Sequence, residues 1–189
     1  GTDALKLAIQ AFEFYGSTTD VIIPANTYIA DALAVSHQPK GKFNITLIDC
    51  DDFFQLDLKK TEQYLSTSRE TYDNCILLPV HLYGHPTDMQ AVKSLSRKYH
   101  CKIIEDASQS HGARSRDEMV GTHSDMCAYS LYPGKSLGAM GDAGIITTDN
   151  TDHHRKICEL RNYGSHKKYY NNDLGWNNRL DPLQAVFLN

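Results

Sequence analysis

Residues 74–106 read NCILLPVHLYGHPTDMQAVKSLSRKYHCKIIED, and this stretch decides the fold class. Its two continuous apolar runs, 74–80 and 102–106, are typical of strands that are buried on both faces. Between these two runs, Thr87 and Gln90 have the spacing of a capping box, which predicts the start of a helix. The apolar residues that follow recur at the spacing of one helix face, and they are Met89, Val92, Leu95 and Tyr99. A strand, a helix and a second strand in this order predict a parallel pair.

The same alternation continues on both sides of this unit. We expect further strands at 20–24, 45–49, 126–132 and 144–148, and helices at 2–12, 26–37, 57–65, 151–163 and from 180 onward. The alternation ends after residue 106, and the segment 164–178 has the composition of an exposed loop. The sequence therefore predicts a three-layer α/β/α fold with a mainly parallel, mixed sheet.

Composition excludes several classes of protein. The chain has 189 residues, a formal net charge of −4 and 41% hydrophobic residues. There is no basic stripe and no apolar run of membrane-spanning length, so we expect neither a nucleic-acid partner nor a membrane partner. Five cysteines, odd in number and widely spaced, predict reduced thiols, and with no signal peptide they predict a cytoplasmic protein.

In parallel sheets, ligands bind beyond the carboxyl ends of the strands. This rule selects residues 26–28, 81–83, 105–109 and 130–135. Within the last group, Pro133 and Gly134 form a turn that carries Lys135. Taken alone, the turn favours a solvated surface lysine, but a lysine that faces a cavity can act as a nucleophile toward a carbonyl.

The sequence lacks the motifs of several other kinds of functional site. Glu105 and Asp106 end a buried strand and can serve as metal ligands, as a general base or as partners of a cationic nitrogen, but no clustered His/Asp set accompanies them, so we expect no metal. There is no G-x-S-x-G elbow, no dinucleotide fingerprint and no P-loop. What remains is a lysine, a buried aspartate, a Gly-Thr helix start and the aromatic Tyr28. A phosphorylated pyridine aldehyde uses these four parts together.

Five segments then resemble the DegT/DnrJ/EryC1/StrS family of pyridoxal-phosphate (PLP) sugar aminotransferases of fold type I. They follow the family in order and spacing over nearly the whole chain, and they are residues 1–5, 79–86, 104–113, 130–144 and 175–181. Position 136 is serine where the family often has asparagine, and Ser108 replaces a common alanine. The resemblance implies that residues 1–189 are most of one PLP-binding large domain, without the family's N-terminal segment and C-terminal small domain.

The resemblance implies roles for the residues around the ring. Lys135 resembles the lysine that binds the cofactor covalently and moves the proton during the reaction. Asp106 matches the aspartate that pairs with the pyridine nitrogen, and a carboxylate there keeps the ring protonated. Gln109 matches the residue beside the phenolic oxygen. Tyr28 matches the aromatic side chain that stacks on the ring.

The resemblance also implies how the phosphate is held. Gly1, Thr2, the backbone of Asp3 and Ser130 match the family's phosphate-binding residues, and the free N–H groups of a helix start suit this dianion. Asn177 matches a residue that reaches the cofactor phosphate of the other subunit. The family therefore implies a homodimer with shared active sites.

The implied reaction moves an amino group from glutamate to a keto-deoxysugar carried on a nucleotide, with dTDP as the expected nucleotide. The run from Lys135 to Gly144 is more similar to members that act on 3-keto sugars than to those that act on 4-keto sugars. The product class is an amino sugar for surface glycans or natural products. Two alternatives keep the fold: a non-catalytic regulator or sensor of this family, and a nucleotide-binding domain without PLP.

Overall fold

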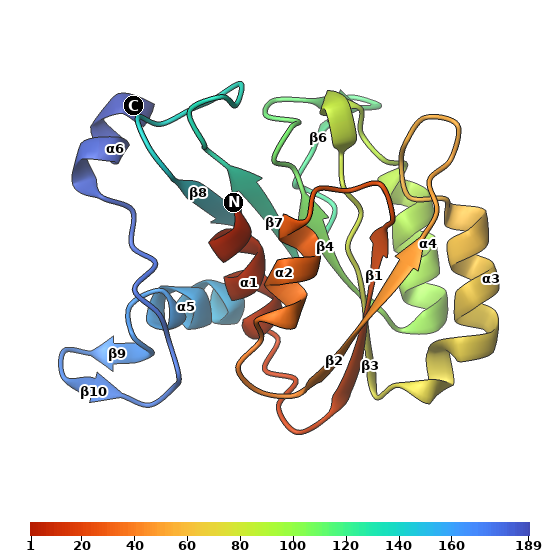
Figure 1. Ribbon diagram of the computed structural model, residues 1–189, viewed down its shortest axis with the longest axis horizontal. Helices are drawn as coiled ribbons and strands as arrows, with labels where there is room; N and C mark the ends of the chain where they lie inside the picture. The colour runs from red at the N-terminus through yellow and green to blue at the C-terminus, as the bar shows by residue number, and fades with distance from the viewer.

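The computed structural model describes all 189 residues and contains a six-stranded sheet with helices on both faces (Figure 1). The strand order is β2-β1-β3-β4-β7-β8. The strands are β1 (Thr18–Pro24), β2 (Lys42–Ile48), β3 (Asn74–Leu77), β4 (Lys102–Asp106), β7 (Met126–Ser130) and β8 (Gly144–Thr147). Every neighbouring pair is parallel except β7 and β8, which are antiparallel. The predicted mainly parallel, mixed sheet is therefore confirmed.

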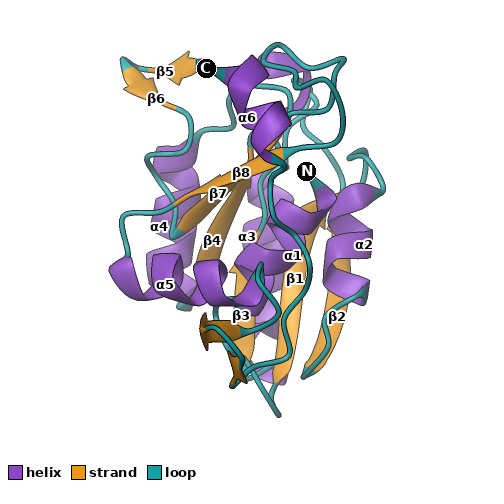
Figure 2. Cartoon of the chain, turned by 90° about the vertical axis from the view of Figure 1, so that its left-hand side faces the viewer, coloured by secondary structure: helices purple, strands orange, loops and turns teal.

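Two groups of helices cover the sheet. Helices α1 (Thr2–Gln10), α2 (Ala30–Ser36) and α5 (Thr151–Leu160) lie on one face, which Figure 2 turns toward the viewer. Helices α3 (Leu58–Ser68) and α4 (Met89–Tyr99) lie on the other face. The apolar stripe predicted between residues 89 and 99 supplies the buried contacts of α4.

Successive strand residues point to opposite faces of the sheet and pack into two separate hydrophobic cores, one on each face. In β3, Ile76 packs under α1 and α2, whereas Leu77 packs under α3 and α4. Ile104 and Ile103 of β4 divide in the same way. Because both faces are covered, the central positions of β3 and β4 are apolar on both sides, and this produces the continuous apolar runs in the sequence.

Two helices begin at residues that the sequence pattern did not indicate. Helix α2 starts at Ala30 rather than after Thr27, whose hydroxyl instead donates a hydrogen bond to Asp31. Helix α4 is capped by Asp88, which accepts the N–H groups of Gln90 and Ala91, so the predicted capping box is wrong. The N–H of Thr87 is already bonded to His81, 3.1 Å away, and its side chain is buried.

The remaining elements are short. They are β5 (Arg114–Ser115), β6 (Glu118–Met119), β9 (Ser165–Lys167), β10 (Tyr170–Asn171), α6 (Pro182–Leu188) and the 3-10 turns η1 (Arg69–Thr71) and η2 (Leu82–Gly84). The segment predicted as a loop at 164–178 thus contains a β9–β10 hairpin. Near the end of this segment, the indole N–H of Trp176 donates a hydrogen bond to the side-chain oxygen of Gln10 in α1 at 2.8 Å. No helix is both long enough and apolar enough to cross a membrane.

The topology opens a crevice above β1 and β3. The connection from β1 leads through α2 to the edge strand β2, and the next connection leads back through α3 to β3 on the other side of β1. Connections that leave in opposite directions separate at the carboxyl ends of the strands, and ligands bind at such switch points.

Candidate active site

A cavity of about 470 Å³ lies at these strand ends. Seven of the nine residues selected from the sequence line it, and they are Gly1, Thr2, Tyr28, Asp106, Gln109, Ser130 and Lys135. They come from the start of α1, the loop after β1, the ends of β4 and β7, and the loops that follow β4 and β7. Residues up to 134 positions apart thus meet in one space that the fold itself forms.

Asp106 is the last residue of β4 and forms part of the cavity wall. Its N–H donates to the carbonyl of Pro79, and its own carbonyl accepts the N–H of His81, both at 3.0 Å. Its carboxylate Oδ1 accepts the N–H of Ser108 at 2.9 Å. The side chain is only 6% exposed, so this carboxylate is fixed in position and largely withdrawn from water.

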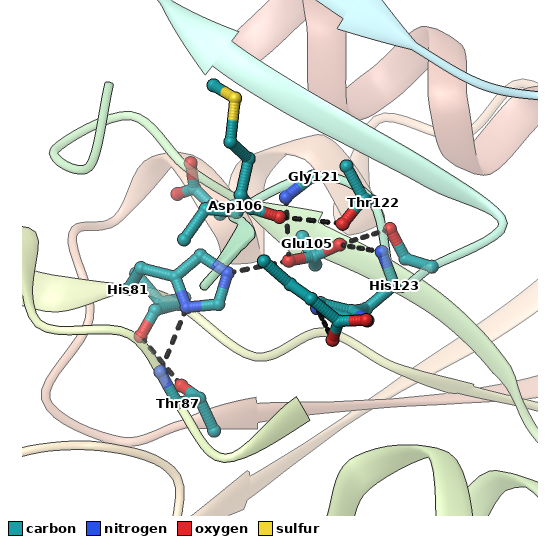
Figure 3. Close-up of polar contacts among 12 residues, drawn as sticks. His81, Thr87, Glu105, Asp106, Gly121, Thr122 and His123 are labelled. Carbon is teal, nitrogen blue, oxygen red and sulfur yellow. Dashed lines mark hydrogen bonds and ion pairs between the residues drawn. The ribbon is translucent and has the colours of Figure 1, made fainter. Parts of the chain in front are cut away.

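Glu105, the neighbouring residue in β4, points to the opposite face of the sheet, as strand geometry requires. Figure 3 shows it between the imidazole of His81 and the segment 121–123. Its Oε2 lies 2.9 Å from His81 Nε2, and neither side chain is exposed. Its carboxylate also accepts the N–H groups of Gly121 and His123 and the hydroxyl of Ser124.

These contacts define the protonation of the pair. His81 Nδ1 accepts the N–H of Thr87, so the proton of the ring lies on Nε2 and is donated to Glu105. Burial opposes ionisation of Glu105, but the hydrogen bonds from His81 and Ser124 outweigh it and hold its pKa below the ordinary value. This satisfied buried network anchors the strand end that carries Asp106.

The start of α1 closely approaches the end of β7. A Cβ atom placed on Gly1 would lie 2.7 Å from the Cβ of Ser130, so no larger residue fits there without a shift. Gly144 lies behind this contact, where a Cβ would be 3.2 Å from the nitrogen of Gly1. The hydroxyl of Ser130 and the first turn of α1 therefore line the same end of the cavity.

Lys135 stands on the predicted turn after β7. Its N–H donates to the carbonyl of Tyr132 at 2.9 Å, and Ala139 returns the chain to Leu131 through a bond of the same length. A Cβ on Gly138 would lie 2.6 Å from the carbonyl oxygen of Pro133, which keeps the turn tight. The side chain of Lys135 lines the cavity, and its amine makes no hydrogen bond or ion pair within the chain.

Tyr28 and Gln109 form further parts of the wall. Tyr28 is 72% exposed, so its ring is available at the mouth of the cavity. Gln109 Oε1 accepts the N–H of Tyr83 at 2.6 Å, and this bond orients its amide group. Tyr83 itself has a φ of 58°, the left-handed conformation that the tight turn after His81 requires.

Two of the nine residues lie outside this cavity. Asp3 and Asn177 line a neighbouring groove, which shares Gly1, Thr2 and Asp142 with the cavity. The carboxylate of Asp3 pairs with Lys6 at 2.7 Å. Asn177 is exposed and forms a bridge with the backbone of Asn162. The chain does not bring these two side chains to the other seven.

Sequence reasoning missed two acidic groups near the site. Asp31 is fully buried behind Asp106, and Asp142 lines the cavity beside Lys135. A signal for Asp31 was present, because it shares one helix face with Ala34 and Val35. No group of three or more His, Cys, Asp or Glu side chains is placed to hold a metal ion.

The fold agrees with the comparisons with known proteins. The model of the DegT/DnrJ/EryC1/StrS aminotransferase family matches residues 1–189, and the chain belongs to this family. It is 41% identical over 188 residues to the dTDP-3-amino-3,4,6-trideoxy-alpha-D-glucose transaminase of Streptomyces venezuelae. It is 38% identical over 189 residues to the UDP-N-acetyl-3-dehydro-alpha-D-glucosamine 3-aminotransferase of Acidithiobacillus ferrooxidans.

A solved structure has the same fold as this chain. The crystal structure of DesV from S. venezuelae, in complex with a ketimine intermediate, superposes with a TM-score of 0.89 at 40% identity. The match covers 99% of this chain and 48% of that chain. The two curated relatives are likewise covered over 48% and 49% of their length, so the chain spans about half the length of the relatives it matches.

Proposed function

We propose that the protein is a PLP-dependent aminotransferase that transfers an amino group from glutamate to a nucleotide-linked keto-deoxysugar. The observation that carries this proposal is the convergence of Lys135, Asp106 and the Gly1–Ser130 contact on one cavity. Family membership and the names of the relatives support the same reaction class. The availability of a lysine amine in the cavity favours catalysis over the two alternatives, a regulator and a PLP-free nucleotide-binding domain.

The residues present fit the cofactor at three points. The close approach of Gly1 to Ser130 leaves backbone N–H groups and a hydroxyl for a phosphate. The unpaired amine of Lys135 suits an aldehyde. The buried carboxylate of Asp106 suits a protonated pyridine nitrogen. When bound, PLP supplies the electron sink for the electron pair left by the broken bond.

The side chains then have separate tasks. Lys135 Nζ would take the proton from the amine-bearing carbon of the donor and, in the second half of the reaction, would deliver a proton to the sugar carbon that receives the amine. Asp106 holds the proton on the ring nitrogen, and Gln109 orients the oxygen side of the ring. Tyr28 covers one face of the ring at the cavity mouth. Leu5 and Leu82 line the cavity and keep water from the reacting atoms.

A second subunit completes the site in this proposal. Asn177 is exposed and lies in a groove next to the cavity rather than within it. A side chain in this position is available to a neighbouring molecule, which supports contact with the cofactor phosphate of a second subunit. The working unit we propose is therefore a cytoplasmic homodimer with shared active sites.

The proposed acceptor is a 3-keto sugar linked to dTDP. The relatives quoted above carry 3-amino or 3-dehydro sugars in their names, with dTDP in one and UDP in the other. A 4-keto sugar is the second candidate, because the roles proposed for the cavity residues concern the cofactor and do not distinguish the two sugar carbons.

The experiment uses the protein at its natural length, loaded with PLP. Glutamate and a panel of dTDP-, UDP- and GDP-linked 3-keto and 4-keto sugars are supplied, and products are identified by mass and NMR. We expect 2-oxoglutarate and a 3-amino sugar. Formation of a 4-amino sugar alone would correct the substrate, whereas the absence of any half-reaction with glutamate or other amino acids would reject the reaction class.

A further inference from the structure

Helix α2 carries an acid where its buried face needs an apolar residue. The buried positions of this helix are Asp31, Ala34 and Val35, which follow the three- and four-residue spacing of one face. Asp31 has no solvent exposure. An ionised carboxylate is rarely buried to this extent without a cation, because its desolvation is costly. The groups around Asp31 must therefore stabilise its carboxylate or keep the carboxyl group protonated.

Those surroundings leave one carboxyl oxygen of Asp31 free. Oδ2 accepts the hydroxyl of Thr27 at 2.5 Å, but Oδ1 has no hydrogen-bond partner. The carboxyl group lies within hydrogen-bonding reach of the carboxyl group of Asp106. Asp106 uses Oδ1 to accept the N–H of Ser108. Two carboxylates in contact cannot both ionise at low cost, and a proton shared between them removes this repulsion.

No cation on the elements around α2 compensates Asp31. Helix α1 carries Asp3 and Lys6, which pair with each other, and its contacts with α2 are otherwise apolar. Strand β1 carries Asp20, which is hydrogen-bonded to Asn44 and Thr46 of β2. The only ionisable side chain of β2 is Lys42, at the first residue of the strand.

Burial and access to the cavity distinguish Asp31 from Asp106 as the holder of a shared proton. Burial, and then the charge of Asp106, raise the pKa of Asp31 well above its ordinary value. Asp106 lines the cavity, where a cationic ring nitrogen can compensate its charge.

We infer that Asp31 is a positioning residue for Asp106: it keeps its proton and donates a hydrogen bond to the Asp106 carboxylate, which stays ionised and directed into the cavity. This inference rests on the proposed function, because it assigns the purpose of the Asp106 carboxylate to the cofactor ring. A neutral donor stabilises the anion without adding charge. Asp106 then supplies one negative charge for one protonated ring nitrogen.

The test uses the protein at its natural length with three substitutions. Asp31→Asn keeps a neutral donor, Asp31→Ala removes it, and Asp20→Asn removes the charge of another buried aspartate, only 2% exposed, outside the cavity. The readouts are the carboxyl ¹³C signals of the apoprotein as a function of pH, the pH titration of the visible absorbance after PLP addition, and the PLP dissociation constant.

We expect one aspartate of the wild-type apoprotein to stay protonated well above the pH at which an ordinary aspartate ionises. This signal should disappear in Asp31→Asn but not in Asp20→Asn. Asp31→Ala should weaken PLP binding roughly tenfold, as loss of one hydrogen bond to a charged group implies, and should shift the absorbance titration. Asp31→Asn should restore both.

An Asp31 signal that titrates in the ordinary range would overturn the inference, even where Asp31→Ala fails to fold. An unchanged absorbance titration in a folded Asp31→Ala would also overturn it. If the wild-type protein shows no PLP absorbance at all, the proposed function fails, while the ¹³C result still reports independently on the proton of Asp31.

Discussion

His81 Nε2 lies 2.9 Å from Glu105 Oε2, and both side chains are completely buried. Glu105 is adjacent in β4 to Asp106, whose carbonyl accepts the N–H of His81. The end of β4 and the segment at His81 are thus joined twice. One connection is the side-chain pair of His81 and Glu105, and the other is the backbone hydrogen bond between His81 and Asp106. This double connection fixes the carboxylate that we assign to the ring nitrogen.

Removing the charge of Glu105 should destabilise the protein. Glu105→Gln replaces one acceptor oxygen by an NH₂ group, which faces the donors of His81, Gly121 or His123. We expect a loss of about 2–3 kcal/mol in the free energy of unfolding, since buried donors are left unpaired. The measurement is the urea denaturation midpoint at an unchanged slope.

The matched control is Glu62→Gln. Glu62 pairs with Lys98 at 2.7 Å on the exposed surface, so its loss should cost less than about 1 kcal/mol. Equal shifts of the midpoint in the two variants would show that the buried network adds nothing special to stability.

The same carboxylate predicts how stability depends on pH. The pKa of Glu105 is lowered in the folded state, so its stabilisation is present above its unfolded value near 4.5 and is lost as the pH falls through the folded pKa. Wild-type stability should therefore fall more steeply below pH 4.5 than that of Glu105→Gln. Denaturation midpoints between pH 3 and 6 test this, and parallel profiles would contradict it.

The contact between α1 and β7 predicts a specific loss of cofactor affinity. Gly1→Ala places a methyl group 2.7 Å from the Cβ of Ser130 and forces the helix start away from the hydroxyl. Overpacking of this kind costs about 1–3 kcal/mol, and if this cost falls on the PLP-bound form the dissociation constant should rise roughly 5- to 150-fold.

Gly134→Ala is the control for this substitution. Its Cβ would meet only the ring of Tyr132, at 3.7 Å, so the dissociation constant should stay within about twofold of the wild-type value. If Gly1→Ala binds PLP as tightly as Gly134→Ala does, the start of α1 does not hold the phosphate.

The buried strands and the turn that carries Lys135 could be predicted from the sequence because local residue patterns determine them. The apolar runs around Ile76 and Ile104 identify buried parallel strands, and the strand-end rule then selects Asp106 and Lys135. The turn at Pro133 is predicted because its residues specify it locally. These features depend on neighbours in the chain and not on distant contacts.

The features that sequence reasoning missed depend on residues far apart in the chain. Thr87 does not cap α4 because its hydroxyl bonds to Gln55 and its N–H bonds to His81. The segment after Gly164 is held by Trp176, whose indole donates to Gln10. Asp31 shares a helix face with Ala34 and Val35, but an aspartate in the first turn of a helix is usually solvated, so the packing of α2 decides that it is buried. Local propensity carries no information about such contacts.

The covalent role of Lys135 is tested most directly by borohydride reduction of the PLP-loaded protein at its natural length, followed by peptide mass analysis. The account predicts a reduced pyridoxyl group on the peptide that contains Lys135, together with visible absorbance before reduction. Both should be lost in Lys135→Ala and retained in Lys59→Ala, a lysine exposed on α3. A pyridoxyl group on another lysine of the wild-type protein, or absorbance that persists in Lys135→Ala, would contradict the account.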